Sequence, residues 1–232
     1  MSQGYIGYQL SQAILNEMKR RGIMRSTACV VTQTVVYPED PAFQNPTKPV
    51  GAFLSEEEAR KRAEETGYTY KEDAGRGWRQ VVPSPQPQRI VEFDAIKDLM
   101  DDGYIVVSTG GGGVPVIERD DSYHGVPAVI DKDRSSAKLA ADFRADMLVI
   151  LTAVEKVCID FNTPQQKAID SMTVAEAEKY IQEGQFAAGS MLPKVQACIE
   201  YVQAYPEGKA LITSLESAAA GLKGETGTVI TA

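Results

Sequence analysis

Residues 104–113 read Y-I-V-V-S-T-G-G-G-G, a short apolar run followed directly by four glycines. Other short apolar runs occur at 128–130, at 147–152 (M-L-V-I-L-T) and at 210–213. Segments with helical periodicity alternate with these runs. Strands that are apolar on both faces and alternate with helices are typical of a mostly parallel, open sheet covered by helices on both sides. The sequence therefore predicts an α/β fold.

The segments around these runs complete the expected order of elements. Capping-box pairs begin two helices, Ser55 with Glu58 and Thr173 with Glu176. Three acid–base pairs at i,i+4 spacing are expected on the first of these helices, Glu56/Arg60, Glu57/Lys61 and Glu58/Arg62. Pro193 suits a first helical position. Further helices are expected at 9–21, 90–101, 135–143, 194–204 and 215–220, and further strands at 28–36 and 228–230.

Prolines and glycines predict irregular backbone at 37–49 and again at 67–89. We therefore expect residues 37–80 to form a small protruding subdomain, a possible lid. It would be inserted into an α/β domain made of residues 1–36 and 81–232.

Composition and charge exclude several classes of partner and of metal or redox site. The 232 residues are 43% hydrophobic and 24% charged, as in ordinary globular domains, and carry a net charge of −8, which argues against a nucleic-acid partner. The apolar runs are too short to span a bilayer, so no membrane partner is expected. Three cysteines without a C-x-x-C motif exclude common zinc and dithiol motifs and favour a reducing cytoplasm. The single histidine, His124, lies in a polar stretch that we expect to be a turn.

The four glycines at 110–113 are the first candidate for chemistry. Glycines after a buried strand let backbone amides approach an anion without interference from a Cβ atom. An ordinary tight turn is the alternative. No G-K-[ST] sequence follows, and Pro115 interrupts any dinucleotide fingerprint.

Lysines at three positions are the second candidate. Lys132 lies in the sequence I-D-K-D, where Asp133 is expected to cap a helix from Arg134, and Lys194 follows G-S-M-L-P. A cation at a helix start opposes the helix dipole, unless an anionic ligand binds there. Lys48 lies in the rigid sequence N-P-T-K-P of the expected lid. Each lysine alone could be a solvated surface residue. Together with the glycines they favour phosphoryl transfer, which requires positioning and charge neutralisation.

These motifs together resemble the carbamate kinases of the amino-acid kinase superfamily. Matching stretches run in family order from the first residue to the last, and N-P-T-K-P and G-S-M-L-P-K are specific to carbamate kinases. The resemblance implies a three-layer α/β/α sandwich, usually a homodimer. It implies reversible phosphoryl transfer between ATP and carbamate, giving ADP and carbamoyl phosphate, with Mg²⁺, often in fermentative arginine catabolism.

The resemblance also assigns roles to single residues. Lys132 and Lys194 would neutralise the transferred phosphoryl group, Asp133 would order these lysines, and Asp131 lies beside it among the catalytic residues. The substrate-binding residues would be Lys48, Gly110, Gly111 and Gly112. The nucleotide-binding residues would be Thr152, Ala153, Val154, Val157 and Met191. Position 153 holds alanine where many members of the superfamily have aspartate.

The front of the family pattern is missing from this sequence. Neither the Gly-Gly-Asn motif nor the H-G-N-G-P-Q-V-G segment of the family occurs. The 232 residues alone are therefore expected to be poorly stable, to bind adenine nucleotides weakly and to turn over slowly, until such a segment is restored. A catalytically impaired nucleotide-binding remnant that acts as an interaction module is the main alternative. A dinucleotide-dependent oxidoreductase is a weaker one.

Overall fold

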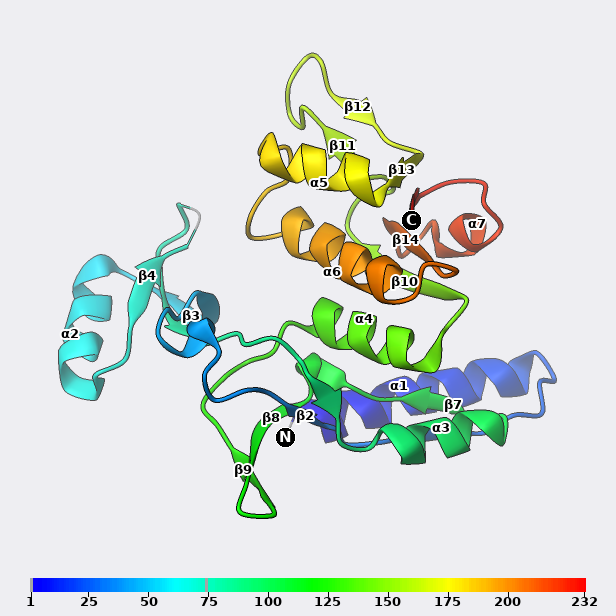
Figure 1. The fold of residues 1–232 in the computed structure, drawn as a ribbon, viewed down its shortest axis with the longest axis horizontal. Helices are drawn as coiled ribbons and strands as arrows, with labels where there is room; N and C mark the ends of the chain where they lie inside the picture. The colour runs from blue at the N-terminus through cyan, green and yellow to red at the C-terminus, as the bar shows by residue number, and fades with distance from the viewer. Residues whose placement is uncertain (1, 74) are drawn as a thin grey trace. The chain divides into compact units, whose positions relative to one another are not determined.

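A computed structural model of the chain describes residues 2–73 and 75–232, which form two compact units. The first unit extends to Ser135 and the second begins at Ser136 (Figure 1). Both units combine helices with open sheets, so the α/β class predicted from the sequence is confirmed. None of the helices formed by the described residues has the length and apolar character needed to cross a lipid bilayer.

The first unit contains a parallel strand pair and a four-stranded sheet. Strand β1 (Thr27–Cys29) pairs with β7 (Ile105–Val107). The larger sheet has the order β6-β2-β8-β9, in which only the central pair, β2 and β8, is parallel. Its strands are β2 (Gln33–Val35), β6 (Arg89–Ile90), β8 (Val114–Arg119) and β9 (Ser122–Gly125). Helix α3 (Phe93–Asp101) begins three residues later than expected.

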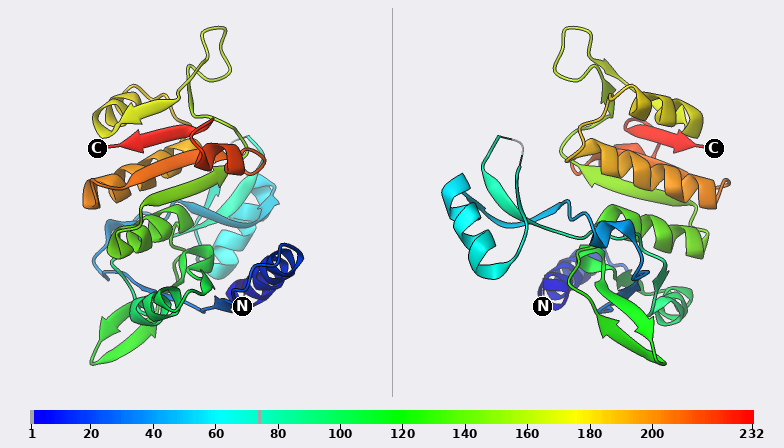
Figure 2. Two further views of the ribbon diagram at one scale, coloured as in Figure 1. Left: turned by 90° about the vertical axis from the view of Figure 1, so that its right-hand side faces the viewer. Right: turned by 60° about the vertical axis from the view of Figure 1, so that its left-hand side comes forward.

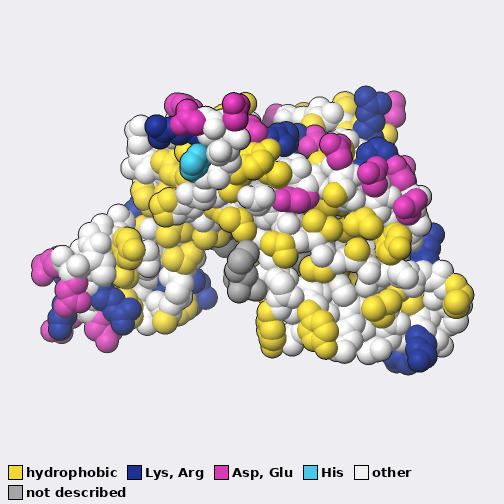
Figure 3. Space-filling model, turned by 90° about the horizontal axis from the view of Figure 1, so that it is seen from below, with side chains coloured by type: hydrophobic (Ala, Val, Ile, Leu, Met, Phe, Trp, Pro, Cys, Tyr) yellow, Lys and Arg dark blue, Asp and Glu magenta, His cyan; other side chains and the backbone are white. Residues whose placement is uncertain are grey.

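Helix α1 (Ser2–Arg20) begins earlier than the expected 9–21, and the expected strand 28–36 is divided into β1 and β2. The buried side-chain amide of Gln3 donates to Thr32 O and accepts from Thr32 N, both at 3.0 Å. The Thr32 carbonyl also accepts the Val114 N–H at 2.8 Å, so Thr32, between β1 and β2, contacts both α1 and β8. Several apolar side chains of α1 are exposed, and Figure 3 shows hydrophobic side chains spread over the lower surface of the molecule.

A separate antiparallel sheet lies largely in the expected subdomain 37–80 and extends beyond it to Val82. Its order is β3-β5-β4, with β3 (Lys48–Leu54), β4 (Tyr70–Glu72) and β5 (Trp78–Val82). The expectation of irregular backbone over 67–89 is therefore wrong for β4, β5 and β6. A short 3₁₀ helix, η1 (Pro41–Phe43), precedes this sheet. Figure 2 shows the sheet and helix α2 (Glu56–Thr66) as a distinct lobe of the first unit.

The start of α2 follows the sequence prediction closely. Ser55 and Glu58 form both bonds of the capping box. Of the expected i,i+4 pairs, Glu56 contacts Arg60. Glu58 caps Ser55 instead of pairing with Arg62, and Lys61 approaches Glu65. The bonds from Ser55 and, to a smaller extent, the charge of Arg62 lower the pKa of the Glu58 carboxyl.

Two expectations near His124 are also wrong. His124 lies in β9 opposite Ile117, not in a turn, because Asp120 and Asp121 take positive φ angles and form the turn of the β8–β9 hairpin. Residues 128–130 form no strand, although Ile130 is buried. The Val129 N–H donates instead to the Pro83 carbonyl at 2.9 Å, across the irregular segment that follows β5.

The second unit is built on one mixed sheet of order β10-β14-β15-β13. Strand β10 (Met147–Thr152) has the predicted bounds and runs parallel to β14 (Lys209–Ser214). Strand β15 (Thr228–Thr231) is antiparallel to β14 and parallel to β13 (Ser171–Thr173). A hairpin of β11 (Cys158–Ile159) and β12 (Lys167–Ala168) was not expected.

Helices cover both faces of this sheet. The helices are α4 (Lys132–Phe143), which begins in the first unit, α5 (Val174–Gln182), α6 (Met191–Ala204) and α7 (Ala218–Leu222). Ala210 and Ile212 of β14 belong to the core cluster that includes α6, whereas Leu211 and Thr213 approach Gly221 of α7. Residues that alternate along a strand face opposite sides, so the second unit has three layers, as expected.

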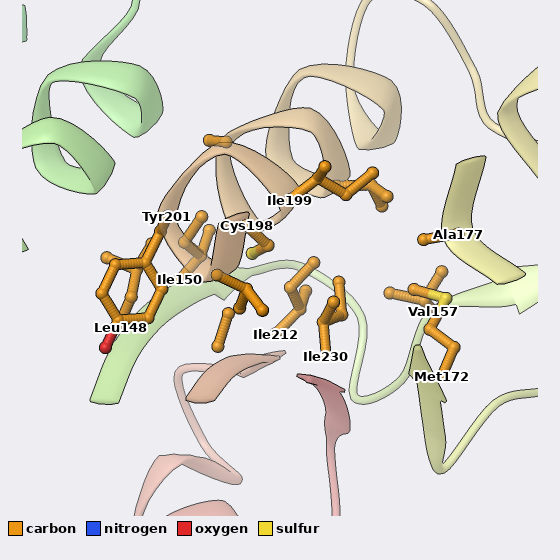
Figure 4. Packing of buried hydrophobic residues seen from close by; sticks show 14 of the residues in the cluster. Leu148, Ile150, Val157, Met172, Ala177, Cys198, Ile199, Tyr201, Ile212 and Ile230 are labelled. Carbon is orange, nitrogen blue, oxygen red and sulfur yellow. The ribbon is translucent and has the colours of Figure 1, made fainter. Parts of the chain in front are cut away.

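The core of the second unit lies between α6 and the sheet. Figure 4 shows Cys198 and Tyr201 of α6 packed over Ile150, Ile212 and Ile230 of three neighbouring strands. Each fully buried aliphatic side chain contributes about 1.5–3 kcal/mol to stability. This packing fixes the position of β10, whose C-terminal end opens into a cavity.

Candidate active site

The glycine stretch forms a 3₁₀ turn, η2 (Gly110–Gly112), directly after β7. Gly112 has φ 94°, and a Cβ atom there would lie 2.4 Å from the Ile130 carbonyl oxygen. Gly113 has φ 84°, and a Cβ atom there would lie 2.2 Å from Thr34 Oγ1. Both positions therefore require glycine for backbone conformation and for space.

Hydroxyl groups from two elements hold this turn in place. Thr34 Oγ1 and Ser135 Oγ each donate to the Gly112 carbonyl at 2.8 Å. Within the turn, the Gly112 and Gly113 amides donate to Thr109 and Gly110. Because the Gly112 and Gly113 N–H groups already donate within the turn, an anion there would be bound by the N–H groups of Gly110 and Gly111.

The aspartate at the start of α4 is Asp131, not Asp133. Asp131 Oδ1 accepts the Asp133 N–H at 2.9 Å, and the Asp131 carbonyl accepts the Ser135 N–H at 3.0 Å. Asp131 is thus the N-cap, and the prediction that Asp133 caps a helix from Arg134 is wrong. The helix begins at Lys132, so that Asp133 lies inside its first turn.

Lys48 joins the same cluster from β3. Its Nζ atom lies 2.6 Å from Asp131 Oδ2, and the Lys48 side chain stays 33% exposed while that of Asp131 is 11% exposed. Burial of Asp131 opposes its ionisation. The hydrogen bond and charge of Lys48 outweigh this effect and, with the Asp133 amide, hold the pKa of Asp131 below its usual range.

Lys132 and Asp133 complete the group in the first unit. Lys132 Nζ lies 3.6 Å from Asp133 Oδ2, and the Lys132 side chain is largely exposed whereas that of Asp133 is buried. The structure therefore brings together Lys48, Asp131, Lys132 and Asp133, next to a turn pinned by Ser135. Four of the catalytic and substrate-binding residues predicted from the sequence thus form one cluster in this unit.

A cavity of about 520 Å³ lies in the second unit at the C-terminal end of β10. Its volume is in the range of small-molecule sites. The expected nucleotide-binding residues Thr152, Ala153, Val154 and Met191 all line it. The other lining residues are Lys156, Cys158, Asp160, Phe161, Gly184, Gln185, Phe186, Ala187 and Ser190.

Two predicted site residues of the second unit lie outside this lining. Val157 is fully buried in the core, and its N–H donates to Thr228 Oγ1 at 2.8 Å. Its side chain packs inside the unit and does not face the cavity. Lys194 is half-buried in the first turn of α6, which begins at Met191, so Pro193 is the third residue of the helix and not the first. Proline is tolerated there because first-turn N–H groups have no intrahelical acceptor.

The sequence did not single out the cavity residues that follow α5. Gln185 Oε1 accepts the Asp160 N–H at 2.7 Å, which ties the segment before α6 to the segment after β11. Phe186 is buried and meets Tyr180 edge-to-face at 6.4 Å. The only available signal was position, since these residues directly precede the G-S-M-L-P-K stretch.

Lys156 places a cation at the cavity. A hydrogen bond from Lys156 to Asp170 raises the pKa of the lysine, although partial burial opposes this. Lys156 therefore carries its positive charge at neutral pH.

Comparisons with known proteins identify the family to which this chain belongs. The amino acid kinase family matches residues 42–213. A carbamate kinase of Clostridium perfringens is 54% identical over 229 residues, which cover 99% of this chain and 73% of that protein. One from Staphylococcus haemolyticus is 50% identical over 230 residues, which cover 99% of this chain and 74% of that protein.

A solved structure shows the same fold. Carbamate kinase from Giardia lamblia bound to AMP-PNP has a TM-score of 0.90 and 44% identity, and the match covers 100% of this chain and 73% of that one. The expected three-layer fold of this family is thereby confirmed. The relatives support the predicted carbamate kinase function and not a non-catalytic remnant. The chain therefore belongs to the amino acid kinase family and, within it, to the carbamate kinases.

Proposed function

We propose that this chain transfers a phosphoryl group between ATP and carbamate, giving ADP and carbamoyl phosphate, and that the residues described above divide this work. The observation that carries the proposal is the cluster of Lys48, Lys132 and two carboxylates beside the glycine turn. Phosphoryl transfer needs such preorganised charge more than it needs covalent chemistry from the protein.

Lys132 and Lys194 supply positive charge to the transferred phosphoryl group. Lys132 is the first residue of α4, and Lys194 lies in the first turn of α6. A lysine at a helix start is repelled by the positive end of the helix dipole. An anionic ligand bound there is attracted both by the lysine and by the helix dipole. Asp133, buried and 3.6 Å from the Lys132 ammonium, restrains that side chain.

Lys48 and the glycine turn bind the carbamoyl phosphate or carbamate. Lys48 lies in β3 of the lobe that we expect to act as a lid, and its ammonium is partly exposed. The amides of Gly110 and Gly111 are placed for anion contact. The hydroxyl groups of Thr34 and Ser135, which donate to the Gly112 carbonyl, hold the turn in place.

The cavity after β10 binds the nucleotide. Thr152, Ala153, Val154 and Met191 offer small and apolar surface, and Phe161 and Phe186 add aromatic surface suited to a base. Lys156 supplies a cation at the same cavity. The Giardia relative bound to AMP-PNP supports nucleotide binding by this fold.

Mg²⁺ fits this site as an ion carried by the nucleotide. Within residues 2–73 and 75–232, no group of three or more Asp, Glu, His or Cys side chains is arranged to hold a metal. Mg²⁺ in kinases is commonly bound through one or two carboxylates and the substrate phosphates, so a protein cage is not required. The ion would add charge neutralisation on the β- and γ-phosphates.

We also propose a homodimer and a cytoplasmic location. The dimer rests on the family resemblance, and light scattering would test it. The location rests on the three cysteines, whose odd number and wide spacing favour a reducing compartment.

The direct test is a coupled assay for ATP made from ADP and carbamoyl phosphate. We expect ATP formation that requires both substrates and Mg²⁺. A protein that binds ADP but forms no ATP with carbamoyl phosphate would contradict the proposal. Replacing carbamoyl phosphate by acetyl phosphate is the matched control for specificity toward the phosphoryl donor.

A further inference from the structure

We propose that Asp131 is a positioning residue, which holds the Lys48 ammonium in place for the anionic substrate. The inference rests on the proposed role of Lys48 in binding carbamoyl phosphate. The sequence alone predicts that Asp131 is a catalytic residue, whereas a positioning residue acts on the substrate only through Lys48.

The carboxylate of Asp131 is itself held rigidly. One oxygen caps α4 through the Asp133 N–H at 2.9 Å, and the other accepts from Lys48 Nζ at 2.6 Å. Because the first bond fixes the carboxylate to the start of the helix, the second bond fixes the ammonium relative to Lys132 and Asp133.

A second contact joins the same two segments. Lys48 pairs with Val82 in the β3–β5 ladder, and the carbonyl of the next residue, Pro83, accepts the Val129 N–H at 2.9 Å. The base of the lobe is therefore tied to residues 129–131 by one main-chain bond and one ion pair. Pro49 directly after Lys48 further limits the backbone of β3 at this point.

The ion pair leaves Lys48 able to bind an anion. A lysine ammonium has three N–H donors, and Asp131 accepts one of them. The Lys48 side chain is three times as exposed as that of Asp131, at 33% against 11%. The opposite role is that Asp131 competes with the substrate for Lys48. The two roles predict opposite changes when the negative charge is removed.

Asp131→Asn separates these roles. Asparagine caps helices as well as aspartate does, so the variant keeps the bond to the Asp133 N–H while losing the charge. We expect KM for carbamoyl phosphate to rise about tenfold or more, since charge-assisted hydrogen bonds are among the strongest. The Kd for ADP, measured by calorimetry, should not change. The matched control is Asp142→Asn, which removes the ion pair with Lys138 on the same helix.

A double-mutant cycle with Lys48→Met completes the test. Methionine keeps an apolar stem and removes the ammonium. In the Lys48→Met background, Asp131→Asn should cause no further rise in KM, because the residue acts through Lys48. Circular dichroism and thermal unfolding of each variant would verify that α4 and the rest of the fold are intact.

The outcomes distinguish this inference from the proposed function. If Lys48→Met leaves KM for carbamoyl phosphate unchanged, the role of Lys48 is wrong and the inference is overturned with it. If Lys48→Met raises KM but Asp131→Asn lowers it or leaves it unchanged, only the positioning role is overturned. Additive effects in the double variant would also overturn it.

Discussion

At the scale of single residues, the two lysines at helix starts carry the sharpest prediction. Lys132→Ala and Lys194→Ala should each lower kcat about a hundredfold, because a charged contact to the transition state is worth roughly 3 kcal/mol. Steady-state kinetics of both variants would measure this. The matched control is Lys138→Ala, which removes the ion pair with Asp142 further along α4. The kcat of this variant should stay near that of wild type. Near-normal kcat in either variant would remove that lysine from the mechanism.

The cavity after β10 gives a second prediction at this scale. Ala153→Phe should fill part of the 520 Å³ cavity and weaken ADP binding about tenfold or more. Calorimetric titration with ADP would measure the loss. Ala175→Phe, at an exposed position of α5, is the control for the added ring and should not alter affinity. Equal affinity of both variants and wild type would place the nucleotide elsewhere.

Residue types were predicted from the sequence better than residue roles. The I-D-K-D stretch correctly indicated a helix start with unusual charge. Two carboxylates lie within three residues there, and only the bond from the Asp133 N–H to Asp131 Oδ1 in the structure identifies Asp131 as the cap. The stretch 152–157 likewise predicted a nucleotide-binding segment, but the complete burial of Val157 shows that this residue belongs to the core.

At the scale of elements, the capping box of α5 is the clearest test of local stability. Thr173 Oγ1 accepts the Glu176 N–H, and Glu176 accepts from the Thr173 N–H and hydroxyl. Thr173→Ala should lower the free energy of unfolding by about 1 kcal/mol. Denaturant unfolding would measure it, with Thr69→Ala, at an exposed position outside the helices and strands, as control. No change in the unfolding midpoint would contradict the role of this cap.

The same cap predicts a pH dependence. The backbone and side-chain hydrogen bonds from Thr173 hold the pKa of Glu176 below its usual range. A carboxylate with a lowered folded-state pKa stabilises the protein above its unfolded pKa, and this stabilisation is lost as pH falls through the folded pKa. The stability difference between wild type and Glu176→Gln should therefore shrink as the pH falls below about 4. A difference that is constant from pH 7 to pH 3 would contradict this assignment.

Elements were predicted well where the chain signals them locally. The M-L-V-I-L-T run became β10 with the same bounds, and both capping boxes formed. Strands β4 and β5 were missed because neighbouring prolines and glycines suggested loops, whereas β5 pairs with both β3 and β4 in one antiparallel sheet. The apolar segment 128–130 was expected to be a strand, yet it is irregular because its bond partner is the isolated Pro83 carbonyl.

At the scale of the whole molecule, the two substrates should depend on different units. Lys48→Ala, in the first unit, should raise KM for carbamoyl phosphate and leave the Kd for ADP unchanged, because the nucleotide cavity is lined by the second unit alone. Ala153→Phe should show the reverse pattern. Calorimetry with ADP and kinetics with carbamoyl phosphate would test both. A large loss of ADP affinity in Lys48→Ala would contradict the separation.

The class of fold followed from the alternation of strands and helices, but the division into units did not. The expected subdomain 37–80 was drawn from turn-forming residues, and its role as a lid stays a prediction. The first unit ends at Ser135 and the second begins at Ser136, so the boundary lies inside the continuous helix α4. A boundary within a helix leaves no mark in composition, since it depends on which long-range contacts each half makes.

The central claim is that the charged cluster at the start of α4 performs phosphoryl transfer to or from carbamate. The most direct measurement is ATP formation from ADP and carbamoyl phosphate by wild type and by Lys132→Ala at saturating substrates. We expect ATP formation by the wild type that requires both substrates, and a rate about a hundredfold lower in the variant. Equal rates in two folded proteins, or no ATP from a wild type that binds both substrates, would contradict it.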